Sequence, residues 1–239
     1  GKTSLGGMAI SEDQSKLYVM NLENRTLYAL NLPGGSVAAS QAVPLTPPSC
    51  PSSSDVRPFA VSFYRSQLYV GMVCSAESTP STPANMRAYV YTVNPSTLAF
   101  GASPVVNFQL NYARGKLHMF GSPTPNATWN PWVTTFTRLS GSLNETGYPQ
   151  PMLSDLAFDN DGNMYLGLRD RGGDQYGNNA LDNPANSTLY QGDSAGDLLL
   201  ACGNPTSGWT LESNAACGGG AATGGAGNNQ GLGGGEYFF

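Results

Sequence analysis

The chain reads Leu153-Ser-Asp-Leu-Ala-Phe158, then Asp159-Asn-Asp-Gly162, then Asn163-Met-Tyr-Leu-Gly-Leu168. On both sides of the acidic stretch, apolar side chains alternate with polar or small ones, which is typical of short β-strands. Asp161-Gly162 between them favours the positive φ angles of a type I′ hairpin turn. A further apolar stretch, Gly196-Asp-Leu-Leu-Leu-Ala201, predicts a third strand beyond a long loop.

The same pattern occurs twice more. Its apolar stretches are 6–10, 16–20 and 26–30 in the first block, and 58–63, 67–72 and 86–93 in the second. A tyrosine recurs in the second strand of each block, as Tyr18, Tyr69 and Tyr165. An outer fourth strand is predicted at 105–110 for the second block and at 209–212 for the third.

A repeated four-stranded antiparallel unit is the signature of a β-propeller blade. We therefore predict an all-β, β-propeller-like fold with about three four-stranded antiparallel blades and long loop insertions. The predicted parts of this single segment, 1–239, are blades at 5–45, 55–112 and 150–213, an insertion at 113–149 and a glycine-rich loop at 217–235. Because propeller rings close with about four to eight blades, we expect the chain to be part of a larger ring, completed by a longer polypeptide or by other copies.

The composition excludes several classes of function. Charged residues make up 11% of the chain, and the formal net charge is −5. Nucleic-acid binding needs clustered basic side chains, and the 11 Lys and Arg residues are scattered. No apolar run is long enough for a membrane span. The only histidine, His118, excludes a multi-histidine metal centre, and no G-x-S-x-G elbow accompanies it. We expect no catalytic residue, no metal and no cofactor.

Two features favour secretion. The first is the set of four cysteines, Cys50, Cys74, Cys202 and Cys217, which contains no CxxC pair. The simplest of the possible pairings joins Cys50 to Cys74 and Cys202 to Cys217. The second is the set of four N-glycosylation sequons, at Asn24, Asn126, Asn144 and Asn186. The alternative is that a chain rich in Asn and Thr produces sequons by chance.

Three loops rich in Ser, Thr and Pro favour extended polyproline II structure over helix and sheet. In a secreted chain such tracts are spacers or acceptors of O-linked glycans. The prolines that we assign as possible O-glycosylation sites are Pro47, Pro48, Pro80, Pro83, Pro123 and Pro125.

Two acidic patterns are candidate chemical sites. Asp159-Asn-Asp-Gly-Asn163 matches the start of a calcium loop with Asp170 at its twelfth position, but the residues between predict a strand, so a plain hairpin turn is favoured. Asp155 and Asp170 are candidates for the carboxylate pair of a glycoside hydrolase. The favoured alternative is a network that ties blades together through Arg–carboxylate bonds. Its members would be Asp155, Asp170 and Asp174 with Arg169 and Arg171.

Aromatic residues in the insertion form a possible interface. Trp129, Trp132 and Tyr148, if exposed, would stack on sugar rings or fill a pocket of a partner protein. The alternative, which we favour slightly, is a loop held to the core by its own aromatic side chains.

Several stretches carry a family resemblance. They are 6–13, 17–22, 57–60, 68–74, 151–159, 166–175 and 229–237. They resemble the blade openings of large secreted surface and adhesin-type proteins, often with SdrD-B-like or other immunoglobulin-like repeats. The resemblance implies an extracellular propeller-like domain in a much longer chain. The sequons and Pro/Ser/Thr loops depart from bacterial members and resemble green-algal extracellular glycoproteins, among them the mastigoneme proteins of ciliary filaments.

We therefore expect a structural or assembly domain of an extracellular cell-surface glycoprotein, such as a mastigoneme-like filament on the ciliary surface or a cell-wall or matrix subunit. Expected partners are other domains of the same long chain, other copies or structural glycoproteins, and glycans. Two alternatives stay open: a carbohydrate- or ligand-binding adhesin propeller, and a secreted glycoside hydrolase or lyase.

Overall fold

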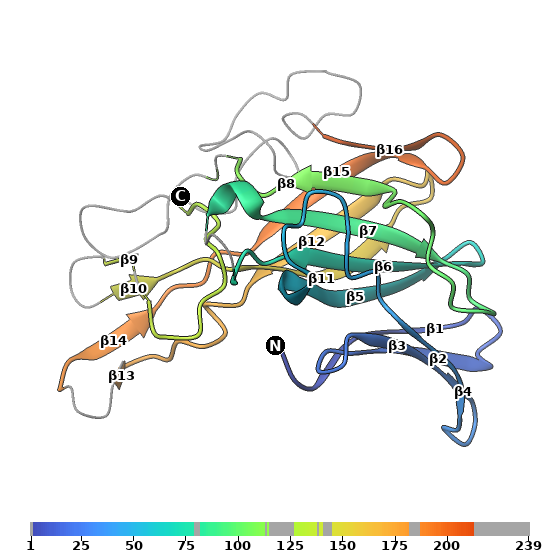
Figure 1. Ribbon diagram of the computed structural model, residues 1–239, viewed down its shortest axis with the longest axis horizontal. Helices are drawn as coiled ribbons and strands as arrows, with labels where there is room; N and C mark the ends of the chain where they lie inside the picture. The colour runs from blue at the N-terminus through green and yellow to red at the C-terminus, as the bar shows by residue number, and fades with distance from the viewer. Residues whose placement is uncertain are drawn as a thin grey trace.

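The computed structural model describes residues 2–78, 82–112, 114, 127–137, 139–140, 145–181 and 187–212. Within these ranges the chain is all-β, as predicted, and its strands form four sheets (Figure 1). The helices there are two short 3-10 turns, Ser53–Asp55 (η1) and Pro83–Asn85 (η2). No helix in the described part of the chain has the length and apolar character that crossing a membrane requires.

Three of the sheets are antiparallel meanders of four strands. Sheet I consists of β1 (Leu5–Ile10), β2 (Lys16–Asn21), β3 (Thr26–Asn31) and β4 (Val37–Ala42). Sheet II consists of β5 (Val56–Tyr64), β6 (Gln67–Cys74), β7 (Arg87–Val93) and β8 (Val106–Gln109). Sheet III consists of β11 (Pro151–Phe158), β12 (Met164–Asp170), β15 (Asp197–Asn204) and β16 (Gly208–Leu211). The three repeated blocks coincide with these sheets, and β8 and β16 lie where the outer strands were predicted.

The turn between β11 and β12 differs from the predicted two-residue hairpin. Phe158 pairs with Met164, so five residues connect the strands, and of these Gly162 alone has a positive φ, +99°. A type I′ turn needs positive φ at two successive residues. The Asp159 side chain instead organises a wider loop, because it accepts several of the backbone N–H groups in it.

About three four-stranded sheets with long loop insertions were predicted, and the described residues contain a fourth sheet that was not predicted. Sheet IV consists of β9 (Leu139–Ser140), β10 (Glu145–Gly147), β13 (Ala180–Leu181) and β14 (Leu189–Gly192), in the order β13-β14-β10-β9. Its central pair, β10 and β14, is parallel. Strands of two to four residues are too short to produce a recognisable alternation.

Two hydrophobic cores hold sheets I, II and III face to face. Between sheets I and II lie buried residues that include Tyr18, Met20, Leu27, Leu68, Val70 and Met72. Between sheets II and III lie residues that include Tyr69, Val73, Val90, Leu153, Leu166 and Leu199. Sheet II therefore has a core on each of its faces.

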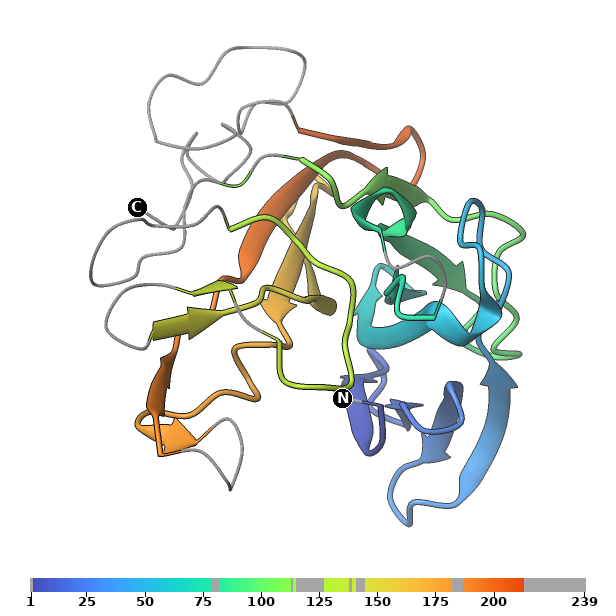
Figure 2. The same cartoon turned by 60° about the vertical axis from the view of Figure 1, so that its left-hand side comes forward.

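The first strands of the three meander sheets lie together in the middle of the molecule. Strand β5 contacts β1 on one side and β11 on the other. Figure 2 shows the four sheets following one another in an arc, from sheet I in blue through sheets II and III to sheet IV. The outer strands β4, β8 and β16 lie away from this centre.

Candidate functional site

The two tryptophans of the insertion are buried, so they do not form the exposed interface that was one interpretation of the sequence. Trp129 is 0% exposed and Trp132 is 1% exposed. The Trp129 indole donates a hydrogen bond to the hydroxyl of Tyr112, and the Trp132 indole donates one to the carbonyl of Pro151. Tyr148 is half-buried. The favoured alternative, a loop held to the core by its own aromatics, describes this arrangement.

Arg114 is fully buried and joins the loop after sheet II to sheet III. Its guanidinium carbon lies 3.5 Å from the centroid of the Trp129 ring. Its terminal nitrogens donate hydrogen bonds of 2.6 to 2.8 Å to the backbone carbonyls of Ala127, Ala195 and Gly196. Its Nε lies 3.3 Å from the Asp197 carboxylate, which also accepts a 2.7 Å hydrogen bond from Tyr112. Burial, together with the Asp197 charge, raises the pKa of Tyr112 well above its ordinary value.

Trp132 is the centre of a second arginine cluster. The guanidinium carbons of Arg171 and Arg57 lie 4.6 Å and 5.6 Å from the centroid of its ring. Arg171 donates a 2.6 Å hydrogen bond to Gln150, and Arg57 donates one of 2.8 Å to Glu77. Burial lowers the pKa of Arg171 from its ordinary value. The two clusters bind the insertion to sheets II and III with directional bonds as well as apolar contact.

Asp155 and Asp170 do not form a carboxylate pair. Across the β11–β12 ladder Asp155 lies opposite Gly167, and Asp170 lies opposite Pro151. The two positions are thus offset by three residue steps along the strands, roughly 10 Å. Asp155 is exposed, whereas Asp170 is 1% exposed. The two-carboxylate site considered for glycoside hydrolysis is therefore not assembled from these residues.

The Asp170 carboxylate instead closes backbone turns. It accepts hydrogen bonds from the N–H groups of Gln150, Gly172 and Ala195. Burial raises the pKa of Asp170, and these bonds partly oppose the rise. Arg169 and Asp174 form a separate exposed pair, with 2.6 Å between nitrogen and oxygen. Of the predicted Arg–Asp network, Asp170 and Arg171 are thus joined through Gln150, while Arg169 and Asp174 pair separately.

The calcium interpretation of Asp159 has no support in the geometry. Its Oδ1 accepts the N–H groups of Asp161, Gly162 and Asn163, and its Oδ2 accepts the Asn163 amide. Burial raises the pKa of Asp159, but these hydrogen bonds outweigh it and the net shift is downward. Asp170, the proposed twelfth ligand, lies at the far end of β12. In the described ranges no group of three metal-ligating side chains comes together.

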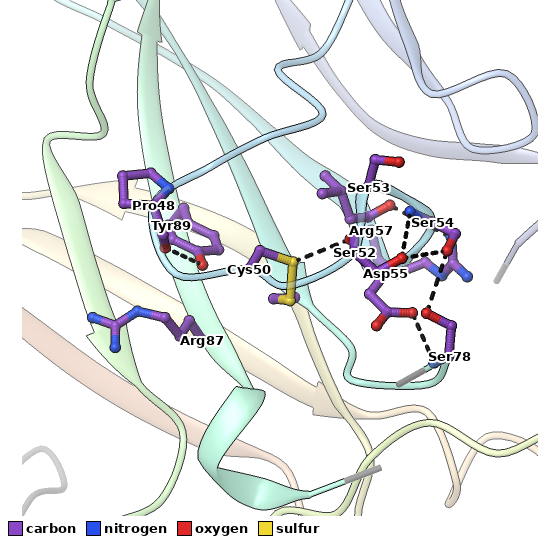
Figure 3. The surroundings of a disulfide bond; sticks show 12 residues. Pro48, Cys50, Ser52, Ser53, Ser54, Asp55, Arg57, Ser78, Arg87 and Tyr89 are labelled. Atoms are coloured by element: carbon purple, nitrogen blue, oxygen red, sulfur yellow. Dashed lines mark hydrogen bonds between the residues drawn. A yellow bond between two sulfur atoms is a disulfide. The ribbon is translucent and has the colours of Figure 1, made fainter. Parts of the chain in front are cut away.

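Cys50 and Cys74 form a disulfide, which was the first of the expected pairings (Figure 3). It joins the loop after sheet I to the end of β6. Beside it, the Tyr89 hydroxyl donates a 2.8 Å hydrogen bond to the carbonyl of Pro48, and the Asp55 carboxylate accepts one of 2.9 Å from the backbone of Ser78. Cys202 is also disulfide-bonded. Cys217 lies outside the described residues.

The expected modification sites are described only in part. Asn24 is exposed in the turn between β2 and β3, where an acceptor side chain is accessible. Pro48 and Pro83 are exposed, and Pro47 is buried. The remaining sites lie outside the described residues, namely Asn126, Asn144, Asn186, Pro80, Pro123 and Pro125. His118 lies there as well.

A pocket of about 380 Å³ opens between sheets II and III. Its lining includes Gln67, Tyr69 and Thr92 of sheet II, and Asn204, Thr206 and Trp209 from β15, β16 and the turn between them. Burial raises the pKa of Tyr69 to about 12, so its hydroxyl keeps its proton at neutral pH. The lining is neutral except for Arg65, and it combines an indole ring with several amide and hydroxyl groups.

Several residues with buried polar bonds in the described ranges were not predicted from the sequence. Arg114 and Tyr112 lie near the start of the predicted insertion, and Arg57 lies in a strand that reads as apolar. One signal was present: in a chain with only 11 basic residues, arginines inside strands or near tryptophans are candidates for buried cation–π contacts.

These features define a disulfide-bonded all-β domain whose buried charges anchor loops. No protein-family profile matches the chain. It is similar to three proteins of Dictyostelium discoideum. Colossin-C is 31% identical over 221 residues, 91% of this chain; Colossin-A is 30% identical over 73% of it, and Colossin-B 31% over 76%. The matches span 19%, 2% and 5% of those proteins, respectively, so this chain covers less than a fifth of each.

Proposed function

We propose that the chain is a structural domain of an extracellular surface glycoprotein, with its sheets arranged as blades of a propeller-like ring. The observation that carries the proposal is the repeated packing: three meander sheets stack face to face, with their first strands side by side. Such an arrangement gives a rigid body whose loops are free to differ.

The use of the buried polar groups supports a structural role. The charged side chains that are buried around Trp129 and Trp132 bond to backbone, to the Gln150 amide or to one another, and the carboxylates considered for catalysis lie apart. The Cys50–Cys74 disulfide is compatible with an oxidising compartment. The exposed sequon at Asn24 is compatible with glycosylation there.

The similarity to regions of the colossins supports a place within a large polypeptide, because those proteins are many times longer than the matched region. We propose a subunit of a surface filament, mastigoneme-like, or of a cell wall or matrix. Its partners would be other domains of the same chain, other copies and structural glycoproteins.

The test is to tag the chain in its own cells and to stain intact and permeabilised cells in parallel. We expect staining of intact cells, and an intact mass that falls on N-glycosidase treatment. An Asn24→Gln variant should lose one glycan, whereas Asn21→Gln, which removes no sequon, should lose none. Staining only after permeabilisation, with reduced cysteines and no glycan, would overturn the proposal.

One observation favours a second candidate, binding of a neutral saccharide. The pocket between sheets II and III offers the Trp209 ring beside amide and hydroxyl groups, a combination suited to sugar rings. A glycan array should then give saturable binding that Trp209→Ala removes. Trp132→Ala is not a test of this candidate, because Trp132 is buried.

A further inference from the structure

One face of sheet I is apolar and is left partly exposed by the described residues, although Val19 within it is only 6% exposed. Cross-strand pairing places its side chains in two rows. The rows are Met8, Val19 and Tyr28, and Ile10, Leu17, Leu30 and Val37. We name these seven residues the outer face of sheet I. Met8, Ile10 and Val37 are 57%, 49% and 59% exposed, and none of the seven is charged. The opposite face carries Tyr18 and Leu27 in the core with sheet II.

The equivalent faces of sheets II and III are buried. In each sheet the residues that flank the recurring tyrosine of the second strand point away from the next sheet. In sheet II this pair is Leu68 and Val70, and in sheet III it is Met164 and Leu166. All four side chains are 0% exposed, because each pair packs against the preceding sheet. Met8, Val61 and Leu156 occupy matching places in the first strands, and their exposures are 57%, 5% and 3%.

We infer that the outer face of sheet I packs against a further four-stranded sheet of the same polypeptide, from outside residues 1–239. That sheet presents the tyrosine-bearing face, as sheet I does to sheet II and sheet II does to sheet III. The inference deepens the proposed function and rests on its repeated-blade arrangement. We expect the contacting face of that sheet to be apolar, because neither row of the outer face of sheet I contains a charged side chain that could form an ion pair.

A sheet of the same polypeptide is favoured over a second copy because it would continue the order in which sheets I, II and III pack on one another. Four strands about 4.8 Å apart, each about six residues long at 3.4 Å per residue, give the face a planar footprint of roughly 400 Å². A sheet in the same polypeptide needs less contact to stay bound than a separate protein does, since its effective concentration is high. The matched colossins leave ample length for further sheets, because the similar region is 19% or less of each.

The test is photo-cross-linking of the protein at the length its cells make. A benzoyl-phenylalanine photoprobe is placed at Met8, and the matched control carries the probe at Leu45, which is 37% exposed on the loop beyond sheet I. After irradiation, peptide mass spectrometry identifies the partner of each probe. We expect the Met8 probe to join a peptide of the same polypeptide from outside 1–239, and the Leu45 probe not to join that peptide.

Two outcomes would overturn the inference. Cross-links from Met8 to residues 1–239 of another molecule, with the dimer mass, would assign the face to a second copy. Absence of any protein cross-link, with the probe quenched by solvent, would show that the face is uncovered. Neither outcome bears on secretion or on the Asn24 glycan, so failure here is distinguishable from failure of the proposed function.

Discussion

At Gly7 the first strands of sheets I and II approach so closely that no side chain fits. A Cβ there would lie 2.7 Å from both the carbonyl oxygen of Phe59 and the amide nitrogen of Val61. Both are backbone atoms that cannot rotate away, so Gly7→Ala should lower the free energy of unfolding by about 1–3 kcal/mol. Urea titration measures the loss. Gly167→Ala is the control, because its nearest neighbour would be 3.5 Å away; equal losses would contradict the explanation.

Asp13 gives a prediction for acid stability. Hydrogen bonds from the Ser11 hydroxyl, and then from the Ser15 amide and hydroxyl, lower the pKa of Asp13 from 3.8 to about 2. Because the folded pKa lies below the unfolded one, the carboxylate stabilises the fold above pH 4, and that contribution is lost as the pH falls toward 2. Asp13→Asn should therefore flatten the dependence of the urea midpoint on pH between 4 and 2. If the urea midpoint of Asp13→Asn depended on pH as steeply as that of the wild type, groups other than Asp13 would cause the dependence.

Arg114 tests whether buried charges hold the insertion in place. Arg114→Ala removes the stack on Trp129 and leaves the Asp197 carboxylate buried without its cation, which should cost about 3–5 kcal/mol. Arg114→Lys keeps the charge but not the planar fork, so an intermediate loss is expected. Thermal unfolding and proteolysis near Ala127 report the change. Arg169→Ala, in an exposed pair, should cost less than about 1 kcal/mol.

At the scale of elements, the disulfide restrains the segment that leads from sheet I to sheet II. It closes a loop of 24 residues in sequence separation, and Cys74 is fully buried. Removing both sulfur atoms with Cys50→Ala and Cys74→Ala should lower the free energy of unfolding by about 2–4 kcal/mol, mainly because the unfolded chain gains freedom. Calorimetry measures the shift. Because Cys202 is also disulfide-bonded, the comparison is made with reductant present in both samples, where the wild type and the double variant should have equal stability; a wild type insensitive to reductant would contradict the explanation.

The elements also show what the sequence could predict. The alternation of side chains around Tyr18, Tyr69 and Tyr165 correctly predicted three sheets. The strands that carry these tyrosines are long enough for the alternation between their two faces to be visible in the sequence. Sheet IV was missed because β9 and β13 have two residues each. The burial of Trp129 and Trp132 depends on arginines distant in sequence, a contact that no local pattern records.

At the scale of the whole molecule, we expect sheet II to determine how the three meander sheets unfold. It forms one core with sheet I and another with sheet III, so loss of either neighbour exposes an apolar face of the same sheet. We therefore predict one cooperative transition for all three meander sheets. Leu68→Ala, in the core with sheet I, and Leu166→Ala, in the core with sheet III, should each lower the free energy of unfolding by about 2–5 kcal/mol.

The two variants distinguish one folding unit from three. If the sheets unfold together, each substitution shifts the entire urea transition to lower concentration, with an unchanged slope by both tyrosine fluorescence and far-ultraviolet circular dichroism. If sheet I unfolded independently, Leu68→Ala would produce a separate transition at lower urea concentration. Leu166→Ala would not shift that transition. We expect the first result, because Leu68 and Leu166 lie in cores on opposite faces of a single sheet whose strands share one hydrogen-bonded ladder.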